Sequence, residues 1–532
     1  MIIPLLALAL VATVRQAVPS DAELPRVYLN TAVSATPSSG RVVRIKSSDN
    51  LQRALDAAQC GDQVLLPAGA KFTGSFTIAR QCSATAWITV TTDGCATLPA
   101  EGARTSPTAA ACYAKLSSRS AAPALSTKPG AKFWRFIGVE FTNEPSVATV
   151  NGTVYLGESS AAQTTLASIP TDIILDRVYV HAPDNTDDRR CVTFNAARTA
   201  IVESYVAGCK SGFDAQAVTG TNGPGPFKIV NNYLEASGEN IAFGGADPWI
   251  ANLVPSDIEI RHNHIFKPMG WRGKWNGKNL IEFKAGRRVL IEANVAENSY
   301  PDGQAGFAVL LWSVNQDGGC TWCVTEHVTV RNNLFRNIAS GFQLTARWSE
   351  RPSALMNHVT IRNNLMIGIN NPAVAASTSR VFQIGNGIAA LTIDHNTGFG
   401  PDATFMWGDS TKAPEQIITN NLTGGGSYQI FTPFGAGSVA WGLVAGPRSK
   451  FAGNVVALAS DWSNVIPGNY YPKSLNAIGL AGGGGAAYSA TAAPADLGLG
   501  ASSPYRGKGT DGKDPGANVP AILAATQGVV QR

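Results

Sequence analysis

The stretch from Gly277 to Asn298, GKNLIEFKAGRRVLIEANVAEN, contains two short predicted strands joined by a tight turn at Ala285-Gly286. The first strand alternates apolar and charged residues over Ile281-Glu-Phe-Lys284, which is typical of a strand with one buried and one solvent-facing side. The second, Val289 to Asn294, ends on an asparagine where the chain must bend. Both the fold and the candidate chemistry can be derived from this unit.

The unit recurs along the chain as an aliphatic residue, two mostly polar residues and an asparagine. It is found at Ile229–Asn232, Ile260–Asn263, Ile291–Asn294, Val330–Asn333, Ile361–Asn364, Ile393–Asn396 and Ile418–Asn421. Successive asparagines are separated by 25 residues (Asn396 to Asn421) to 39 residues (Asn294 to Asn333). Short strands repeated at such intervals predict a solenoid, specifically a parallel β-helix. We expect the asparagines to stack at one bend, since each amide can bond the same group one coil away.

Composition agrees with an exported, turn-rich β protein. Charged residues make up 15% of the 532 residues, and 54 are glycine. The net charge of +5 is mild, and no Lys/Arg cluster accompanies it, so nucleic acid is excluded as a partner. A mildly basic surface is compatible with an acidic polysaccharide. We expect one β-helix over residues 42–476, a Gly/Ala-rich tail over 477–532 packing on it, and a monomer.

The N-terminus carries an apolar run over residues 2–13, which is too short to span a bilayer. It predicts a signal peptide over residues 1–17, followed by a Pro/Ser/Ala-rich linker or arm over 18–41. Export predicts a secreted, periplasmic or extracellular protein with no membrane partner.

Eight cysteines agree with an oxidising compartment, because their number is even and they lie in neighbouring pairs. The expected pairing is sequential: Cys60 with Cys82, Cys95 with Cys112, Cys191 with Cys209, and Cys320 with Cys323. The Cys320-Thr-Trp-Cys323 segment lacks the second cysteine pair of a zinc ribbon, so a local disulfide is favoured there.

A capping segment precedes the repeats. Residues 47–62 predict a capped helix with Leu51, Leu55 and Ala58 on one face and Gly61 as its stop, and residues 63–78 predict strand, turn and strand. This helix, the following Val64-Leu-Leu-Pro-Ala-Gly69 and the asparagine turns resemble the pectate-lyase-like right-handed β-helix superfamily. The resemblance implies an all-β parallel β-helix with an N-terminal capping helix. It does not fix the activity, because that fold supports lyases, hydrolases, esterases, epimerases and adhesins.

Motifs of individual families in that superfamily narrow the choice. The polygalacturonase series is incomplete here, since Gly-His-Gly is absent, and the pectin methylesterase and mannuronan epimerase motifs are also missing. Lyases of the chondroitinase-B and alginate-lyase type place calcium-binding glutamates five and seven residues before a general-base lysine. Around Lys284 those positions are Asn279 and Gly277, so the two glutamates of a calcium site of that design are absent here.

Alignment of the buried residues of successive coils predicts which outward side chains lie side by side. The pairs taken as register are Ala215/Ala217, Ile241/Phe243, Ile281/Phe283, Val309/Leu311 and Leu344/Ala346. With this register, Lys284, Trp312 and Arg347 form one outward column with about 4.8 Å between coils. Ala242 and Gly244, one coil earlier, leave room for a sugar beside Lys284.

The chemistry of that column suits β-elimination on a uronate polymer, which requires a base, a cation at the carboxylate and a donor for the leaving oxygen. Lys284 is the candidate base, with a pKa expected to be lowered by burial or by Arg287 and Arg288. Arg347 is the candidate cation for the carboxylate, and Glu282 completes the catalytic set.

Residues around this set are candidates for binding. The expected substrate-binding residues, several of them in an insertion over residues 267–278, are Trp312, Gln216, Asn240, Trp271, Arg272, Lys267 and Gln343. Asp214, Glu239 and Asp247 are candidate ligands for a divalent cation, and calcium is the one cofactor considered.

The sequence is also compatible with two other functions. One is a β-helix glycoside hydrolase with paired carboxylates, in which Glu282 acts with Asp214 or Glu239. The other is a non-catalytic carbohydrate-binding or surface protein, in which Lys284 is only a solvated residue paired with Glu282.

Overall fold

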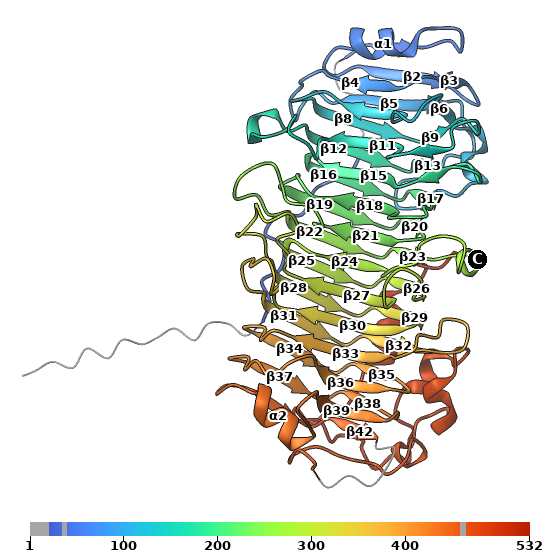
Figure 1. Cartoon of the computed structure of the whole chain (residues 1–532). Coiled ribbons are helices and arrows are strands. Elements are labelled where there is room, and N and C mark those ends of the chain that lie inside the picture. The colour runs from blue at the N-terminus through green and yellow to red at the C-terminus, as the bar shows by residue number, and fades with distance from the viewer. Residues whose placement is uncertain (1–20, 34–39, 458–463, 532) are drawn as a thin grey trace, which may run out of the picture.

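The computed structural model describes residues 21–33, 40–457 and 464–531. The chain forms a right-handed parallel β-helix whose coils stack along one axis, as Figure 1 shows. Each full coil contributes one strand to each of three long sheets, which we call sheets A, B and C. The described strands pair in parallel except β39 with β40, which pair antiparallel.

The strands of sheet A are β1 (Val42–Arg44), β2 (Gln63–Pro67), β5 (Ile88–Asp93), β8 (Lys132–Ile137), β12 (Thr171–Asp176), β16 (Ala197–Val202), β19 (Gly225–Val230), β22 (Ser256–Arg261), β25 (Gly286–Glu292), β28 (Thr325–Arg331), β31 (Asn357–Arg362), β34 (Leu391–Asp394), β37 (Gln416–Thr419) and β41 (Lys450–Ala452). Those of sheet B are β3 (Lys71–Thr73), β6 (Ala114–Ser118), β9 (Val139–Asn143), β13 (Tyr179–His181), β17 (Tyr205–Cys209), β20 (Tyr233–Ala236), β23 (His264–Phe266), β26 (Val295–Ser299), β29 (Leu334–Ile338), β32 (Leu365–Ile367), β35 (Thr397–Phe399), β38 (Leu422–Gly424) and β42 (Val455–Ala457). Those of sheet C are β4 (Phe76–Ile78), β7 (Leu125–Thr127), β11 (Val154–Gly157), β15 (Arg190–Asn195), β18 (Gln216–Gly220), β21 (Glu239–Phe243), β24 (Ile281–Phe283), β27 (Phe307–Trp312), β30 (Ser340–Thr345), β33 (Arg380–Gly385), β36 (Ala403–Trp407), β39 (Tyr428–Thr432) and β40 (Gly435–Ala436). A separate pair is formed by β10 (Thr149–Val150) and β14 (Asp187–Asp188).

The predicted asparagine stack is confirmed at the bend between sheets A and B. The amide Nδ2 of Asn333 lies 2.9 Å from the Oδ1 of Asn364, and the same bond links Asn294 to Asn333. The residue before each asparagine is in the left-handed region, for example His262 at φ 57° and Asn332 at φ 58°. The bend therefore needs an amide that satisfies the freed backbone groups. The stack as a whole runs through Asn232, Asn263, Asn294, Asn333, Asn364, Asn396, Asn421, Asn454 and Asn469.

The capping helix is also present, as α1 (Leu51–Ala57). The side chain of Asn50 accepts a hydrogen bond from the backbone N–H of Arg53, and Leu51 and Leu55 are buried over the first coil. The helix ends at Ala57 and not at the predicted Gly61.

Four disulfides pair the cysteines as predicted: Cys60–Cys82, Cys95–Cys112, Cys191–Cys209 and Cys320–Cys323. All eight cysteines lie in the described part of the chain, and none of them is free.

The N-terminal arm lies along the outer face of sheet A. The backbone N–H of Ala22 donates to Thr360, that of Arg26 donates to Asp257, and the carbonyl of Leu29 accepts from Lys228. The predicted signal peptide lies outside the described residues. In the described ranges no helix is long and apolar enough to cross a membrane.

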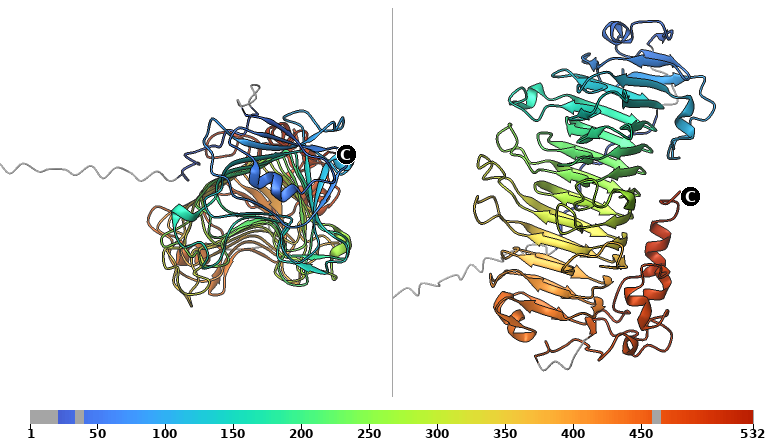
Figure 2. Two further views of the ribbon diagram at one scale, coloured as in Figure 1. Left: turned by 90° about the horizontal axis from the view of Figure 1, so that it is seen from above. Right: turned by 45° about the vertical axis from the view of Figure 1, so that its right-hand side comes forward.

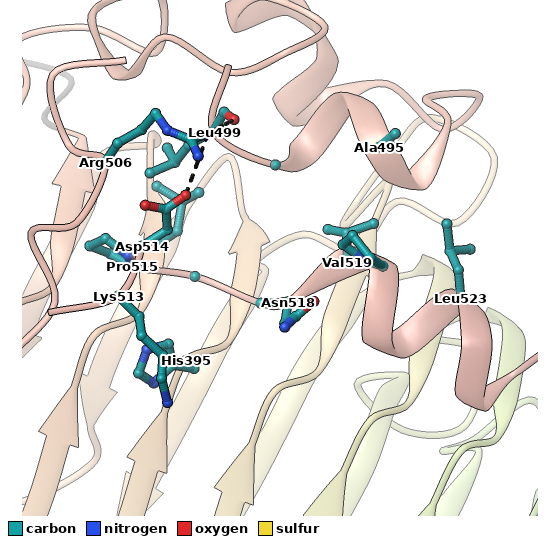
Figure 3. A pocket seen from close by; sticks show the side chains of 15 residues that line it. His395, Ala495, Leu499, Arg506, Lys513, Asp514, Pro515, Asn518, Val519 and Leu523 are labelled. Carbon is teal, nitrogen blue, oxygen red and sulfur yellow. Dashed lines mark hydrogen bonds and ion pairs between the residues drawn. The ribbon is translucent and has the colours of Figure 1, made fainter. Parts of the chain in front are cut away.

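The C-terminal segment, residues 477–531, covers the later coils of sheet B, as the right-hand view of Figure 2 shows. Its helix α3 (Val519–Ala525) buries Ile522 against an outward apolar column of sheet B. That column comprises Val295, Leu334, Leu365, Leu422 and Val455. A cavity of about 560 Å³ remains beneath the segment, with Arg506 pointing to Asp514 and His395 beside Lys513 (Figure 3). One further helix, α2 (Ser438–Val444), packs on β39 and β40 at the end of sheet C (Figure 1).

Candidate functional site

The register of sheet C differs from the predicted one in two places. Ile241 pairs with Val218, and not with Ala215, so the column beside Ala242 and Glu282 contains Thr219 and not Gln216. Phe342 pairs with Val309, which places Thr345 beside Trp312. The prediction that Arg347 shares the column of Lys284 and Trp312 is therefore wrong, because Arg347 lies two residues further along an exposed loop.

The predicted neighbours Lys284 and Trp312 do lie on adjacent coils, because Phe283 pairs with Leu311. Lys284 follows β24 directly, and its Nζ lies 2.8 Å from the Oε1 of Glu282. Alternation within β24 explains this pair, since Ile281 and Phe283 are buried in the core and Glu282 points outward.

Five charged side chains gather at the outer side of sheet C, and we call Asp214, Glu239, Lys278, Glu282 and Lys284 the lysine–carboxylate cluster. Lys278 is bonded to Asp214, and its Nζ lies 3.6 Å from Glu239. Glu239 accepts a 2.8 Å hydrogen bond from Gln216, which lies beside it on β18. The side chains of Glu239 and Glu282 are only 3% and 4% exposed, whereas those of Lys278 and Lys284 are 14% and 19% exposed. Solvent and ligands therefore reach the two lysine side chains and Asp214, whose side chain is 42% exposed, whereas the two glutamates are covered.

Electrostatics in the cluster follow from burial and from these pairs. Burial raises the pKa of Glu239, and the Glu282 carboxylate raises it further. Burial lowers the pKa of Lys284, but Glu282 outweighs burial and the pKa is raised above its ordinary value. The prediction of a lowered pKa at Lys284 is thus wrong. Arg287 and Arg288 are paired instead with Glu326 and Asp257 at sheet A.

Lys267 and Asn240, both predicted to bind substrate, are instead internal. Lys267 is fully buried and donates to the carbonyl of Gly238 and, at 3.0 Å, to the Oδ1 of Asn240. Asn240 also donates to the carbonyls of Leu234 and Phe266. Burial lowers the pKa of Lys267. These two residues fasten the start of the insertion to the preceding coil.

The rest of the insertion faces two directions. Arg272 donates to the carbonyls of Ala373 and Ala375, so it holds a distant loop and is not directed at Lys284. Trp271 lies at the outer side of sheet B, with the Nζ of Lys210 5.7 Å from its ring centre. At the other end, Asn279 donates to Glu282 at 2.8 Å. The insertion thus separates a region on sheet B from the cluster on sheet C.

The remaining candidates flank the cluster. The indole of Trp312 meets Trp348 edge to face at 6.0 Å, and its N–H is buried without a hydrogen-bond partner. Gln343 lies two coils after Glu282 in the same outward column, and Gln216 is buried against Glu239.

The three predicted metal ligands do not come together. Asp214 and Glu239 share Lys278, whereas Asp247 accepts from the backbone N–H of Gly319 in a separate loop. Among the described residues no group of three His, Cys, Asp or Glu side chains is arranged to hold a metal ion. Lys278 supplies the positive charge between Asp214 and Glu239, so these residues do not fit a calcium site.

Sequence reasoning did not identify Lys278 and Asn279 as members of the site. Lys278 ends the insertion over residues 267–278 and Asn279 follows it directly, in a stretch without a repeat where no alternation indicates which way a side chain points. The only signal was their closeness in sequence to Glu282.

Comparison with known proteins shows similarity of fold to solved structures. No protein-family model matches the chain, and no curated protein matches it. Among solved structures, an alginate lyase of polysaccharide lyase family 6 is similar with a TM-score of 0.47 at 13% identity, over 81% of this chain and 53% of that one. A mannuronic-acid-specific family 6 lyase from human gut microbiota is similar with a TM-score of 0.41 at 11% identity, over 82% of this chain and 92% of that one. The tailspike protein of E. coli bacteriophage HK620, in complex with a hexasaccharide, has a TM-score of 0.37 at 10% identity, over 80% and 64% of the two chains.

Proposed function

We propose that this chain is an exported polysaccharide lyase that cleaves a uronic-acid-containing polysaccharide by β-elimination. The observation that carries the proposal is the lysine–carboxylate cluster. It presents two partly exposed lysine side chains, Lys278 and Lys284, beside the buried carboxylates of Glu239 and Glu282. Glu282 holds Lys284 in place, and Asp214 with Glu239 holds Lys278, so a uronate carboxylate meets fixed positive charges.

The roles follow from position. Lys278 neutralises the uronate carboxylate. Arg347 does not have this role, because it lies outside the column of Lys284 and Trp312. Lys284 in its neutral form takes the proton from the carbon next to that carboxylate. The electrons of the C–H bond form the C=C bond, the glycosidic C–O bond breaks, and the Lys284 ammonium returns the proton to the leaving oxygen. Trp312, half-buried on the coil after Lys284, offers an indole ring that can stack on a sugar ring.

The raised pKa of Lys284 sets the pH dependence. Its ion pair with Glu282 keeps the ammonium protonated at neutral pH, and only the neutral amine can act as a base. The elimination rate should therefore increase as pH rises above neutrality.

The test is incubation with alginate, polygalacturonate and glycosaminoglycans, while the ultraviolet absorbance of unsaturated products and the formation of reducing ends are both followed. The proposal expects unsaturated products on at least one of these polymers, with and without added calcium. Reducing ends without unsaturation, or no cleavage of any acidic polymer, would contradict it.

One observation favours a second candidate, a glycoside hydrolase. Burial and the neighbouring Glu282 raise the pKa of Glu239, so one carboxyl can hold a proton while the other is ionised. Such a pair is what acid-assisted glycoside hydrolysis uses. This function would be selected if the wild type released reducing ends without unsaturated products and Glu239→Gln lost that activity.

A further inference from the structure

We propose that a cleft on the outer face of sheet B, separate from the lysine–carboxylate cluster, binds a pyranose unit of a polysaccharide chain. The cleft has a volume of about 570 Å³. Its main lining residues are Tyr179, Asp184, Lys210, Glu235, Trp271 and Trp275. It does not depend on the proposed lyase activity, since none of these residues belongs to the cluster.

The floor of the cleft is built by an irregular strand. The pairing of β17 with β20 shifts between Val206 and Cys209, and Gly208 within the shift has φ 72°. A Cβ at Gly208 would lie 2.7 Å from the carbonyl oxygen of Ala182, so only glycine fits there. Bulges of this kind redirect the side chains that follow them. The redirected residue here is Lys210.

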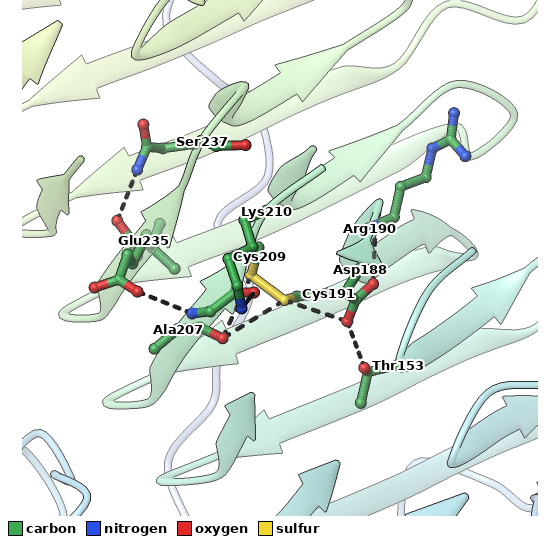
Figure 4. Close-up of a disulfide and its surroundings, with 12 residues drawn as sticks. Thr153, Asp188, Arg190, Cys191, Ala207, Cys209, Lys210, Glu235 and Ser237 are labelled. Atoms are coloured by element: carbon green, nitrogen blue, oxygen red, sulfur yellow. Dashed lines mark hydrogen bonds between the residues drawn. A yellow bond between two sulfur atoms is a disulfide. The ribbon is translucent and has the colours of Figure 1, made fainter. Parts of the chain in front are cut away.

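Lys210 is held rigidly in this position. The disulfide Cys191–Cys209 joins the residue before it to the preceding coil, as Figure 4 shows. Lys210 is only 4% exposed. Its Nζ donates to the carbonyls of Pro183 at 3.1 Å and Gly208 at 3.4 Å. An ammonium has three donors. The third is available to a ligand at the base of the cleft.

The walls offer the surfaces that sugar rings need. The rings of Trp271 and Trp275 are half-buried, with centres 5.7 and 5.9 Å from the Nζ of Lys210. Tyr179, also in the lining, stacks on His181 with 4.2 Å between ring centres. Flat aromatic faces that remain partly accessible are suited to the apolar face of a pyranose.

The charges of the cleft balance, which favours a hydroxyl-rich ligand over a small anion. Lys210 and Lys274 are matched by Asp184 and Glu235, and His181 is paired with Glu140. Glu235 is already satisfied, because it accepts from the backbone N–H of Gly208 and from Tyr233. Asp184 and Lys274 are exposed at the mouth of the cleft. There the Asp184 carboxylate can accept hydrogen bonds from the hydroxyl groups of a ligand, and the Lys274 ammonium can donate hydrogen bonds to them.

The cleft remains uncovered because the C-terminal segment covers sheet B only from β26 onward. From β26 onward, the first outward residue of each sheet B strand is mostly aliphatic and is buried by that segment. In the earlier strands the same position holds Tyr179, Tyr205, Tyr233 and His264. The sequence thus changes from an aliphatic to an aromatic column where the sheet is left open to a ligand.

The experiment is affinity electrophoresis through gels that contain alginate, polygalacturonate or hydroxyethyl cellulose, with Lys284→Arg in the background to prevent cleavage. We expect retardation by at least one polymer, with apparent affinity falling about tenfold in Trp275→Ala and in Asp184→Ala. Trp249→Ala, which changes a tryptophan that is 52% exposed elsewhere, is the matched control and should migrate as its parent. Thermal unfolding of each variant checks that the fold is retained, and Asp184→Ala keeps the test valid if Trp275→Ala does not fold.

The proposal is overturned if no gel retards the protein, or if both cleft variants are retarded like their parent. It is also overturned if Lys278→Ala abolishes retardation while the cleft variants do not, because binding would then lie at the cluster. Failure of the lyase proposal looks different: no polymer is cleaved by the wild type, and retardation persists.

Discussion

Lys284 bonds to the buried Glu282 carboxylate at 2.8 Å, so a substitution there must separate loss of a base from loss of an ion pair. Lys284→Arg keeps the positive charge, but its guanidinium cannot lose a proton in the working pH range. We expect turnover to fall by about 10²- to 10⁴-fold, the usual contribution of a general base, while the melting temperature changes little. The measurement is the initial rate of unsaturated product formation together with thermal unfolding.

The matched control is Arg347→Ala. Arg347 is exposed and lies outside the column of Lys284, so its removal should leave most of the activity. Retention of more than a tenth of the activity in Lys284→Arg would exclude Lys284 as the base.

Asp188 provides a prediction of pH dependence that is independent of activity. It is fully buried beside the Cys191–Cys209 disulfide, and its Oδ2 accepts from Thr153 at 2.6 Å (Figure 4). Burial raises the pKa of Asp188 to about 6. The folded state therefore binds this proton more tightly than the unfolded state, so the stabilisation is complete below pH 4 and is lost as pH rises through 6.

Asp188→Asn removes this titration and keeps an oxygen that can accept from the backbone N–H of Arg190. The variant should therefore gain stability relative to the wild type between pH 4 and 6, by up to about 3 kcal/mol. Denaturant unfolding of both proteins across that range measures the difference. A constant difference would show that Asp188 titrates normally.

The asparagine stack is the element on which the coils depend, because each amide satisfies backbone groups at the bend. Asn333 donates to the carbonyls of Ile291 and Arg331 and accepts from the backbone N–H of Asn294. Asn333→Ala leaves these buried groups without partners, at about 1–3 kcal/mol each when unsatisfied. We expect a loss of roughly 2 to 5 kcal/mol in the free energy of unfolding, measured by denaturant titration.

Asn469→Ala is the comparison within the same stack. Asn469 is half-buried at its end, so water can replace the lost amide, and the effect should be smaller. Equal losses at both positions would mean that the stack is not what stabilises the bend.

The C-terminal segment determines which faces of the whole molecule are available. Its α3 helix buries Ile522 against sheet B, while the adjacent Leu523 is 42% exposed. Ile522→Ala should cost about 2–5 kcal/mol, as is usual for a fully buried aliphatic residue, and Leu523→Ala less than about 0.5 kcal/mol. Thermal unfolding measures the costs, and binding of an apolar dye reports whether the column from Val295 to Val455 has become exposed. Similar behaviour of the two variants would contradict this packing.

The repeat, the bends and the disulfides could be predicted from the sequence because each depends on a local pattern. Alternation in Ile281-Glu-Phe-Lys284 sets which side chains face the core, and the asparagine units set where the chain turns. Cysteines 18 residues apart, such as Cys191 and Cys209, can meet on adjacent coils of such an array.

Alternation predicts which face a residue occupies but not its partner on the next coil. Phe342, Leu344 and Ala346 are all apolar with the same parity, so a shift of two residues preserves the pattern and wrongly aligned Arg347 with Lys284. All five residues of β18 are buried, which removes even the parity signal there.

The sequence by itself determined the parallel β-helix, its asparagine bend, its cap and the outward position of Glu282 and Lys284. Only the tertiary structure decided that Lys278 completes the cluster, that Lys267 is internal, and that Trp271 faces sheet B. The physical reason is that strands repeat, so their neighbours follow from a period. The insertion over residues 267–278 has no period, and its side chains are placed by contacts with coils distant in sequence.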